Sequence, residues 1–200
     1  MAKPRKPRPR AESMQETRAA LIAAALEEFS RHGLDASLDG ICARAGLTRG
    51  AFYVHFADRE ALIIAVMEHV LGSFVAVLTG VRPEVGGSER AIELFVAAAR
   101  ARSPAVHGGR ALRFHHLMDA CQRSREVSER YRRLVLDARD RIADGLAIDQ
   151  QAGRIRDDVK PAALADLAAA FALGVVAALE LELPLDLARL GKTLSATLRA

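Results

Sequence analysis

The sequence predicts an all-α protein, and two observations predict that fold class. Along most of the 200 residues, apolar side chains recur at intervals of three and four residues, the spacing of one face of an α-helix. No segment alternates apolar and polar residues over a useful strand length. Glycines and prolines interrupt the helical pattern at several points, so we expect a series of helices joined by short turns.

The composition is that of a folded, soluble domain. Half of the residues are hydrophobic and 27% are charged, which argues against a disordered chain. The two cysteines, Cys42 and Cys121, form no CxxC pair, so neither a disulfide scaffold nor a zinc ribbon is predicted. No signal peptide is recognised, and the longest uncharged apolar run, Leu167–Leu179, is shorter than the ~20 residues that span a membrane. We therefore expect a cytoplasmic protein.

The first 12 residues form a basic segment, which we expect to be a disordered arm. Its five basic residues are Lys3, Arg5, Lys6, Arg8 and Arg10. Without them the chain carries 24 basic and 25 acidic residues, so its net charge of +4 is due to this segment. Three interspersed prolines oppose a helix and favour an extended backbone. Such an arm is attracted to DNA, RNA or an anionic membrane, or is a solvated tail without a specific role.

The first helix is predicted to begin at a capping-box pattern, Ser13 to Glu16. An apolar stripe at helical spacing follows: Leu21, Ile22, Ala25, Leu26 and Phe29. Gly33 predicts the end of this helix, because glycine readily adopts the left-handed conformation there.

Two short helices and a longer one are predicted next. Ser37 caps the second helix and Gly46 ends it, Thr48 caps a third over residues 49–55, and Asp58 caps a fourth. Residues 37–56 therefore have the spacing of a helix-turn-helix, whose second helix enters the major groove of DNA. A helical hairpin of this length also occurs as a plain packing unit, so spacing alone leaves both interpretations open.

The rest of the chain is predicted to be helical as well. A loop at residues 81–87 precedes a helix over 88–102, and helices over 112–123 and 127–150 follow a break at 103–109. Pro161 suits the first turn of the next helix, and Pro184 is expected to end it. Its expected buried face comprises Leu164, Leu167, Ala168, Phe171, Val175 and Leu179. A last helix spans 185–198.

The N-terminal third resembles a known family. Its motifs are Thr17-Arg18 in the first helix, the turn Ala45-Gly46-Leu47-Thr48, and the block Tyr53-Val54-His55-Phe56 before a capped helix. This combination, over residues 17–62, resembles the DNA-binding domain of TetR-family transcriptional regulators. The resemblance implies a helix-turn-helix DNA-binding domain over 13–74 and a helical ligand-binding and dimerisation domain over 75–200. It implies a homodimeric regulator, in most cases a repressor, that binds a palindromic operator and responds to a small molecule.

The DNA-contacting residues expected within this motif are Ser37, Asp39, Thr48, Arg49, Gly50, Ala51, Tyr53, Val54, His55 and Arg59. Arg49 suits a bidentate contact to guanine, and Ala51 and Val54 suit a thymine methyl. By analogy with the family, Tyr53, His55 and Arg59 donate to phosphates. Asp39 accepts from cytosine or contacts the backbone. The five basic residues of the arm, Lys3 to Arg10, are expected to add affinity.

Some residues of the motif have other expected roles. Leu47, Phe52 and Phe56 are read as packing residues. Gly40 departs from the family pattern and is expected to loosen the second helix. Cys42 is expected to be a buried thiol.

The C-terminal part is less informative. The expected dimer surface comprises Phe171, Gly174, Ala177, Ala178, Leu187, Leu190 and Leu194, although these faces could also close only the domain's own core. The expected ligand pocket comprises Phe95, Phe114, His115, His116 and Met118. His115 and Asp119 share a helix face, but no fourth ligand is evident, so no metal site is predicted.

Other classes of protein are less favoured by the sequence. Nothing resembles a nucleophile elbow, a phosphate loop or a carboxylate pair, so neither an enzyme nor a cofactor is expected. A helical dimer that binds DNA without a ligand would recognise many sequences equally. A membrane-surface protein would bind anionic vesicles and ignore duplex DNA.

Overall fold

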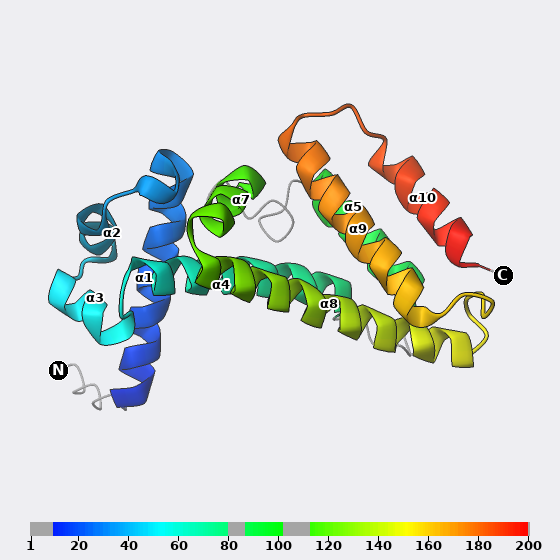
Figure 1. Cartoon of the computed structure of the whole chain (residues 1–200), viewed down its shortest axis with the longest axis horizontal. Helices are drawn as coiled ribbons and strands as arrows, with labels where there is room; N and C mark the ends of the chain where they lie inside the picture. The colour runs from blue at the N-terminus through cyan, green and yellow to red at the C-terminus, as the bar shows by residue number, and fades with distance from the viewer. Residues whose placement is uncertain (1–9, 80–86, 102–112, 200) are drawn as a thin grey trace, which may run out of the picture.

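A computed structural model describes residues 10–79, 87–101 and 113–199. Every regular element in these ranges is a helix, which confirms the all-α prediction (Figure 1). The elements are α1 (Arg10–His32), η1 (Gly33–Asp35), α2 (Leu38–Ala45), α3 (Arg49–His55), α4 (Arg59–Thr79), α5 (Gly87–Arg100), α7 (Phe114–Arg123), α8 (Arg125–Gln151), α9 (Pro161–Glu180) and α10 (Leu187–Leu198).

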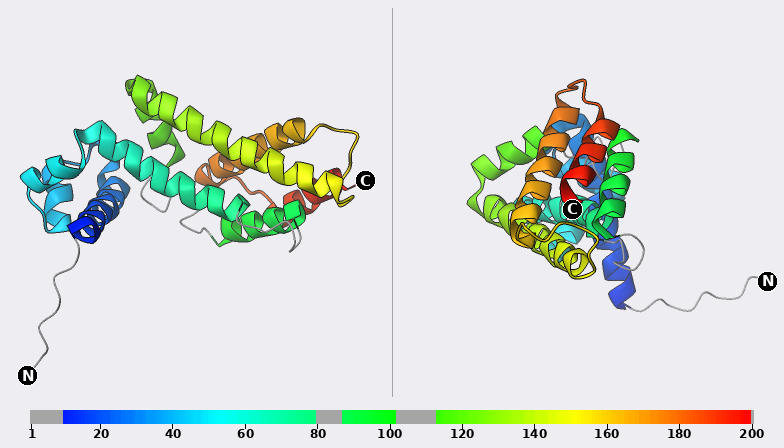
Figure 2. Two further views of the ribbon diagram at one scale, coloured as in Figure 1. Left: turned by 90° about the horizontal axis from the view of Figure 1, so that it is seen from below. Right: turned by 90° about the vertical axis from the view of Figure 1, so that its right-hand side faces the viewer.

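The helices form two groups joined by two long helices. The helices α1, α2 and α3 lie at one end of the molecule, and α5, α9 and α10 lie at the other (Figures 1 and 2). The helices α4 and α8 run along the molecule between these groups, and they pack against each other. A displacement at one end can therefore reach the other end along continuous helices.

The N-terminal group is built on an apolar core that it shares with later helices. Its largest fully buried side chains are Leu21, Phe29, Ile41, Phe52, Leu62, Val66 and Met67. Leu117 of α7 and Val127 of α8 belong to the same core. The C-terminal part of the chain thus helps to hold the N-terminal helices in place.

Most predicted helix ends in the first half are confirmed. The hydroxyl of Ser37 accepts a hydrogen bond from the Gly40 N–H at 3.0 Å, and the Asp58 carboxylate accepts one from the Ala61 N–H at 2.8 Å. Gly33 and Gly46 both have positive φ angles, of 67° and 68°. The short 3-10 helix η1, which begins at Gly33, was not predicted.

The predicted start of the first helix is wrong. Helix α1 begins at Arg10, so Ser13 lies inside it, and its carbonyl oxygen accepts a hydrogen bond from the Thr17 hydroxyl at 2.8 Å. The expected arm of residues 1–12 therefore overlaps the helix by three residues. Lys3, Arg5, Lys6 and Arg8 lie outside the described residues, as does most of the loop expected at 81–87.

Helix α9 differs from prediction at its end and in part of its buried face, of which Leu164 and Val175 are buried as predicted. It ends at Glu180, where Glu182 adopts a φ of 55°, rather than continuing to Pro184. Leu167 is 47% exposed, whereas Ala165, Ala172 and Ala178 are buried. Because α9 is apolar almost all round, its sequence cannot specify which side faces the core.

Helix α9 is also the one described helix long and apolar enough to cross a membrane by length and composition. Only 28% of its apolar window is buried within this chain. Core helices of soluble proteins meet the same test, so this helix alone does not indicate a membrane protein.

Candidate functional site

The helices α2 and α3 and the turn between them form a compact unit with locally encoded ends. Gly46 at the end of α2 adopts the left-handed conformation, and the Leu47 N–H donates to the Cys42 carbonyl at 2.9 Å. Thr48 then begins α3, and its hydroxyl accepts a hydrogen bond from the Ala51 N–H at 3.2 Å. Both caps satisfy backbone groups that a helix end otherwise leaves unpaired.

Helix α2 is attached to α1 by an ion-pair cluster. Arg44 donates from Nε to the buried Glu28 carboxylate at 2.6 Å and from Nη1 to Glu27 at 2.9 Å. The hydrogen bond from Arg44 is the main cause that holds the pKa of Glu28 below its usual value of 4.5. A Cβ atom at Gly40 would lie 3.2 Å from the Glu28 carboxylate, so glycine lets α2 approach α1 closely.

Helix α3 has one buried face and one exposed face. Phe52 and Phe56 are buried, and their ring centroids lie 5.5 Å apart. Arg18 of α1 lies over the Phe56 ring, with its guanidinium carbon 5.1 Å from the centroid. On the other side Tyr53 is 56% and Val54 is 68% exposed. A large aromatic and a β-branched residue on a solvent-facing turn suggest a contact surface, since the fold gains little by their exposure.

The other residues expected to contact DNA lie around this exposed face. Arg49 and Gly50 are exposed, whereas Ala51 and His55 are partly buried. Asp39 of α2 accepts an ion-pair contact at Oδ1 from Arg49 Nε at 2.8 Å. The fold thus joins two residues for which the sequence predicts separate contacts with DNA.

Arg59 is placed differently from the expected phosphate contact. Its guanidinium donates to the backbone carbonyl of Leu34, so it ties the start of α4 to η1. The side chain is only partly exposed, and a phosphate contact would compete with this bond. This contact joins residues 25 positions apart, and no local sequence signal indicates it.

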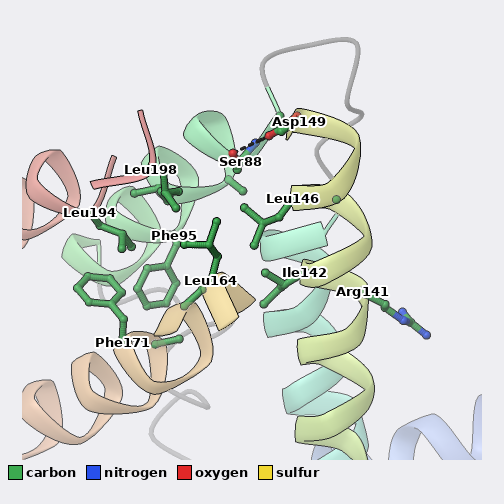
Figure 3. A pocket seen from close by; sticks show the side chains of 16 residues that line it. Ser88, Phe95, Arg141, Ile142, Leu146, Asp149, Leu164, Phe171, Leu194 and Leu198 are labelled. Atoms are coloured by element: carbon green, nitrogen blue, oxygen red, sulfur yellow. Dashed lines mark hydrogen bonds between the residues drawn. The ribbon is translucent and has the colours of Figure 1, made fainter. Parts of the chain in front are cut away.

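A second candidate site is a cavity of about 180 Å³ between α5, α8, α9 and α10 (Figure 3). Its walls are mainly apolar and include Ile92, Phe95, Ile142, Leu146, Leu164, Ala168, Phe171, Leu194 and Leu198. The rings of Phe95 and Phe171 meet edge to face, with centroids 6.1 Å apart. The Arg141 side chain is directed away from the other lining residues.

One carboxylate, that of Asp149, lies at the end of this cavity and is 1% exposed. Its Oδ2 accepts hydrogen bonds from the Ser88 N–H at 2.6 Å and the Ser88 hydroxyl at 2.5 Å. Its Oδ1 accepts from Arg154 at 2.6 and 2.9 Å. Burial opposes the ionisation of Asp149, but these bonds outweigh it, and the pKa is lowered. Both carboxylate oxygens are thus already engaged by protein donors.

The residues expected to form a ligand pocket fall into two places. Phe95 lines the cavity, whereas Phe114, His115, His116 and Met118 lie on α7, outside its lining. His115 pairs with Glu180 at the end of α9, and His116 packs near Gly33. Burial is the main cause of the lowered pKa of His116. The α8 and α10 residues of the cavity were missed, because only the packing of distant helices brings them together.

The residues expected to form a dimer surface are also divided. Phe171 and Leu194 line the cavity, and Ala178 and Leu187 are buried within the chain. Ala177 and Leu190 are partly buried, whereas Gly174 is exposed. The large exposed apolar residues of this region are Leu167, Leu181, Leu183 and Leu185, of which Leu167 was expected to be buried.

Comparison with known proteins identifies the N-terminal group. Residues 21–66 match the family model described as "Bacterial regulatory proteins, tetR family", which covers α2, α3 and most of the core beneath them. Over 180 residues, the chain is 28% identical to the HTH-type transcriptional regulator UidR of Escherichia coli K12, covering 88% of this chain and 86% of UidR. Residues 21–66 therefore form a DNA-binding domain of the TetR family.

Solved structures of TetR fold extend the likeness to both halves of the chain. Salmonella enterica GusR superposes with a TM-score of 0.74 at 23% identity, over 92% of this chain and 95% of GusR. A complex of triclosan with SmeT, described as the repressor of a Stenotrophomonas maltophilia efflux pump, gives 0.67 at 24% identity, over 92% and 90% of the two chains. By its TetR-family domain and its regulator relatives, the chain is a DNA-binding transcriptional regulator rather than an enzyme.

Proposed function

We propose that this regulator is a cytoplasmic homodimeric repressor that binds a palindromic operator through α3 and releases it when a small molecule occupies the cavity. The observation that carries the proposal is the exposed face of α3. Arg49, Tyr53 and Val54 project from a helix whose other side is anchored by Phe52. A rigid helix with exposed side chains of this kind suits the major groove.

The homodimer is supported by the exposed side of α9 and the segment after it. Leu167, Leu181, Leu183 and Leu185 form apolar surface that a single chain leaves in water. Among the described residues, a Cβ atom at the exposed Gly174 would meet no atom beyond its own stretch of α9 within 4 Å, so a second helix has room to approach there. Two copies that pair these surfaces would bury them and present two α3 helices to one duplex.

The size and lining of the cavity favour an uncharged, mainly apolar effector. A cavity of about 150 Å³ with apolar walls accommodates a benzene-sized molecule, and this one measures about 180 Å³. The carboxylate of Asp149 has no unused oxygen for a ligand cation, and Arg141 does not point inward to meet a ligand anion. The triclosan bound to SmeT is an example of a small molecule held by this fold.

The helices provide a physical route from the cavity to the DNA-binding group. Helix α8 contributes Ile142 and Leu146 to the cavity and Val127 to the N-terminal core. An effector that prefers one placement of α8 would shift the population of DNA-binding arrangements by its difference in affinity. Regulation by effector therefore needs no new contact at the DNA itself.

The test of operator binding uses selection from random duplexes with the full chain. We expect a two-fold symmetric site that binds two chains, as measured by sedimentation. Arg49→Ala should weaken binding to this site by about 30-fold or more, because the dimer loses two bidentate contacts to guanine and each contributes about 1–3 kcal/mol. Arg90→Ala removes an equally exposed arginine on α5 and is the control. Equal operator binding by Arg49→Ala and Arg90→Ala would refute the proposed contact of Arg49 with DNA. If the selection recovers duplexes of unrelated sequence, the ligand-independent architectural dimer is favoured.

The test of effector chemistry uses three probes of similar shape: propylbenzene, 3-phenylpropanoate and 3-phenylpropylamine. We expect only the uncharged probe to raise the thermal unfolding temperature, because burying an unpaired charge is costly. Gly145→Leu places a side chain at the cavity wall, where a Cβ meets nothing within 4 Å, and should abolish this shift. Gly72→Leu, an open position on α4, is the matched control. Equal shifts with a charged probe would contradict the proposed effector class.

A further inference from the structure

An ion pair between two helices lies at the edge of the proposed DNA-reading face. Asp39 is in the first turn of α2, and Arg49 is the first residue of α3. The Oδ1 of Asp39 lies 2.8 Å from the Nε of Arg49, while the two side chains remain 72% and 59% exposed. The pair is thus formed in the absence of DNA and on the solvent side of both helices.

The acidic partner stands on a rigid support. Helix α2 is tied to α1 by the Arg44–Glu28 contact at 2.6 Å, and its first turn is capped by Ser37. The turn to α3 is closed by the hydrogen bond from Leu47 to Cys42. Asp39 therefore holds its place relative to α3, whereas the long side chain of Arg49 would otherwise sample many rotamers.

The geometry of the contact leaves the base-reading end of Arg49 unoccupied by Asp39. A guanidinium has five N–H donors in a planar fork, and the contact to Asp39 uses the Nε side. The two terminal nitrogens stay available for the O6 and N7 acceptors of guanine, which require two donors side by side. A carboxylate closest to Nε thus restricts where the guanidinium lies without occupying its two terminal nitrogens.

Stability accounts for only part of the benefit of a carboxylate at this position, because a negative charge in the first turn of α2 interacts favourably with the helix dipole. Exposed ion pairs contribute little to the free energy of folding, because water and salt screen them. A negative charge beside a DNA-binding helix also repels phosphates. The helix dipole would favour any acidic residue in this turn, but it does not account for the contact of Asp39 with Arg49, which orientation of the arginine does.

We propose that Asp39 is a positioning residue that orients Arg49 toward one guanine in each half-site and so sets the sequence specificity at that base pair. This inference rests on the proposed contact of Arg49 with DNA. Asp39 would act through Arg49 and would not itself read a base.

The experiment measures discrimination at the selected operator with the full chain. The dissociation constant is determined at fixed salt for all four base pairs at the position that Arg49→Ala affects. Asp39→Ala should reduce the preference for guanine there by about tenfold while binding to a random duplex stays equal or becomes tighter. Asp39→Asn keeps an acceptor oxygen and should retain part of the preference. The double variant with Asp39→Ala and Arg49→Ala should lose no more of the preference for guanine than Arg49→Ala alone.

The control is Asp35→Ala on η1, which removes the same charge from an exposed ion pair with Arg123 of α7. It should leave the guanine preference unchanged, which separates orientation from a general loss of negative charge. If the guanine preference is retained by Asp39→Ala and lost in Arg49→Ala, the positioning role of Asp39 is overturned. The proposed contact of Arg49 with guanine then still holds. If Asp39→Ala instead loses the preference for cytosine at a different position, Asp39 reads a base itself. That result also overturns the positioning role. Guanine preference retained by Arg49→Ala refutes the proposed base contact and its positioning together.

Discussion

Replacing Phe52 with alanine is expected to lower the free energy of unfolding by about 3–5 kcal/mol. The Phe52 ring is fully buried and packs against Phe56, between α3 and the helices beneath it. The substitution removes apolar area from the core and leaves a cavity that the surrounding helices can fill only in part. Urea unfolding followed by circular dichroism measures the loss.

The matched control lies two residues away on the same helix. Val54 is 68% exposed, so Val54→Ala should change the free energy of unfolding by less than about 0.5 kcal/mol. It should nevertheless weaken operator binding, since the valine is proposed to contact DNA. Equal effects of the two substitutions on stability would show that α3 does not present the faces described.

Replacing Asp149 with alanine is expected to cost about 3 kcal/mol, because removal of one partner leaves buried polar groups without the other. Asp149 accepts bonds from Ser88 at the start of α5 and from Arg154 after α8. The substitution leaves the Ser88 N–H and hydroxyl and the Arg154 guanidinium without these acceptors. Asp166→Ala is the control, since Asp166 is exposed and pairs with Arg139 at 3.2 Å.

The effect of Asp149→Ala should depend on pH in a defined direction. The pKa of Asp149 is below its usual value of 3.8 in the folded chain. A group whose pKa is lowered by folding contributes its full stabilisation at pH values above its pKa in the unfolded chain. This contribution is lost as the pH falls through its pKa in the folded chain. The difference in stability between the native protein and Asp149→Ala should therefore be largest near neutral pH and narrow below 3.8. A difference that grows on acidification would contradict the ionised state of Asp149.

The helix-turn-helix was predictable because its signals are local. Ser37, Gly46 and Thr48 each act on backbone groups within four residues, and the structure places them at the expected helix ends. The alternation of buried Phe52 with exposed Tyr53 also follows from helical spacing. The start of α1 was predicted wrongly because a capping box also fits the interior of a helix that begins earlier.

Contacts between distant segments were not predictable in the same way. The pairing of Arg59 with the Leu34 carbonyl and of Glu180 with His115 joins residues far apart in the chain. The cavity is similar, because four helices from different parts of residues 87–198 supply its walls. A hydrophobic residue in each of these helices suits a core, a cavity or an interface equally.

By itself, the sequence determined the helical class, the ends of α2 and α3, and the residues that α3 turns toward solvent. These features depend on backbone capping and on a period of 3.6 residues, which act over a few positions. Only the tertiary structure decided that Asp39 meets Arg49, that Asp149 closes one end of an apolar cavity, and that Leu167 stays exposed. The reason is that α9 and its neighbours are apolar on several sides, so the choice of buried face is made by the packing of whole helices.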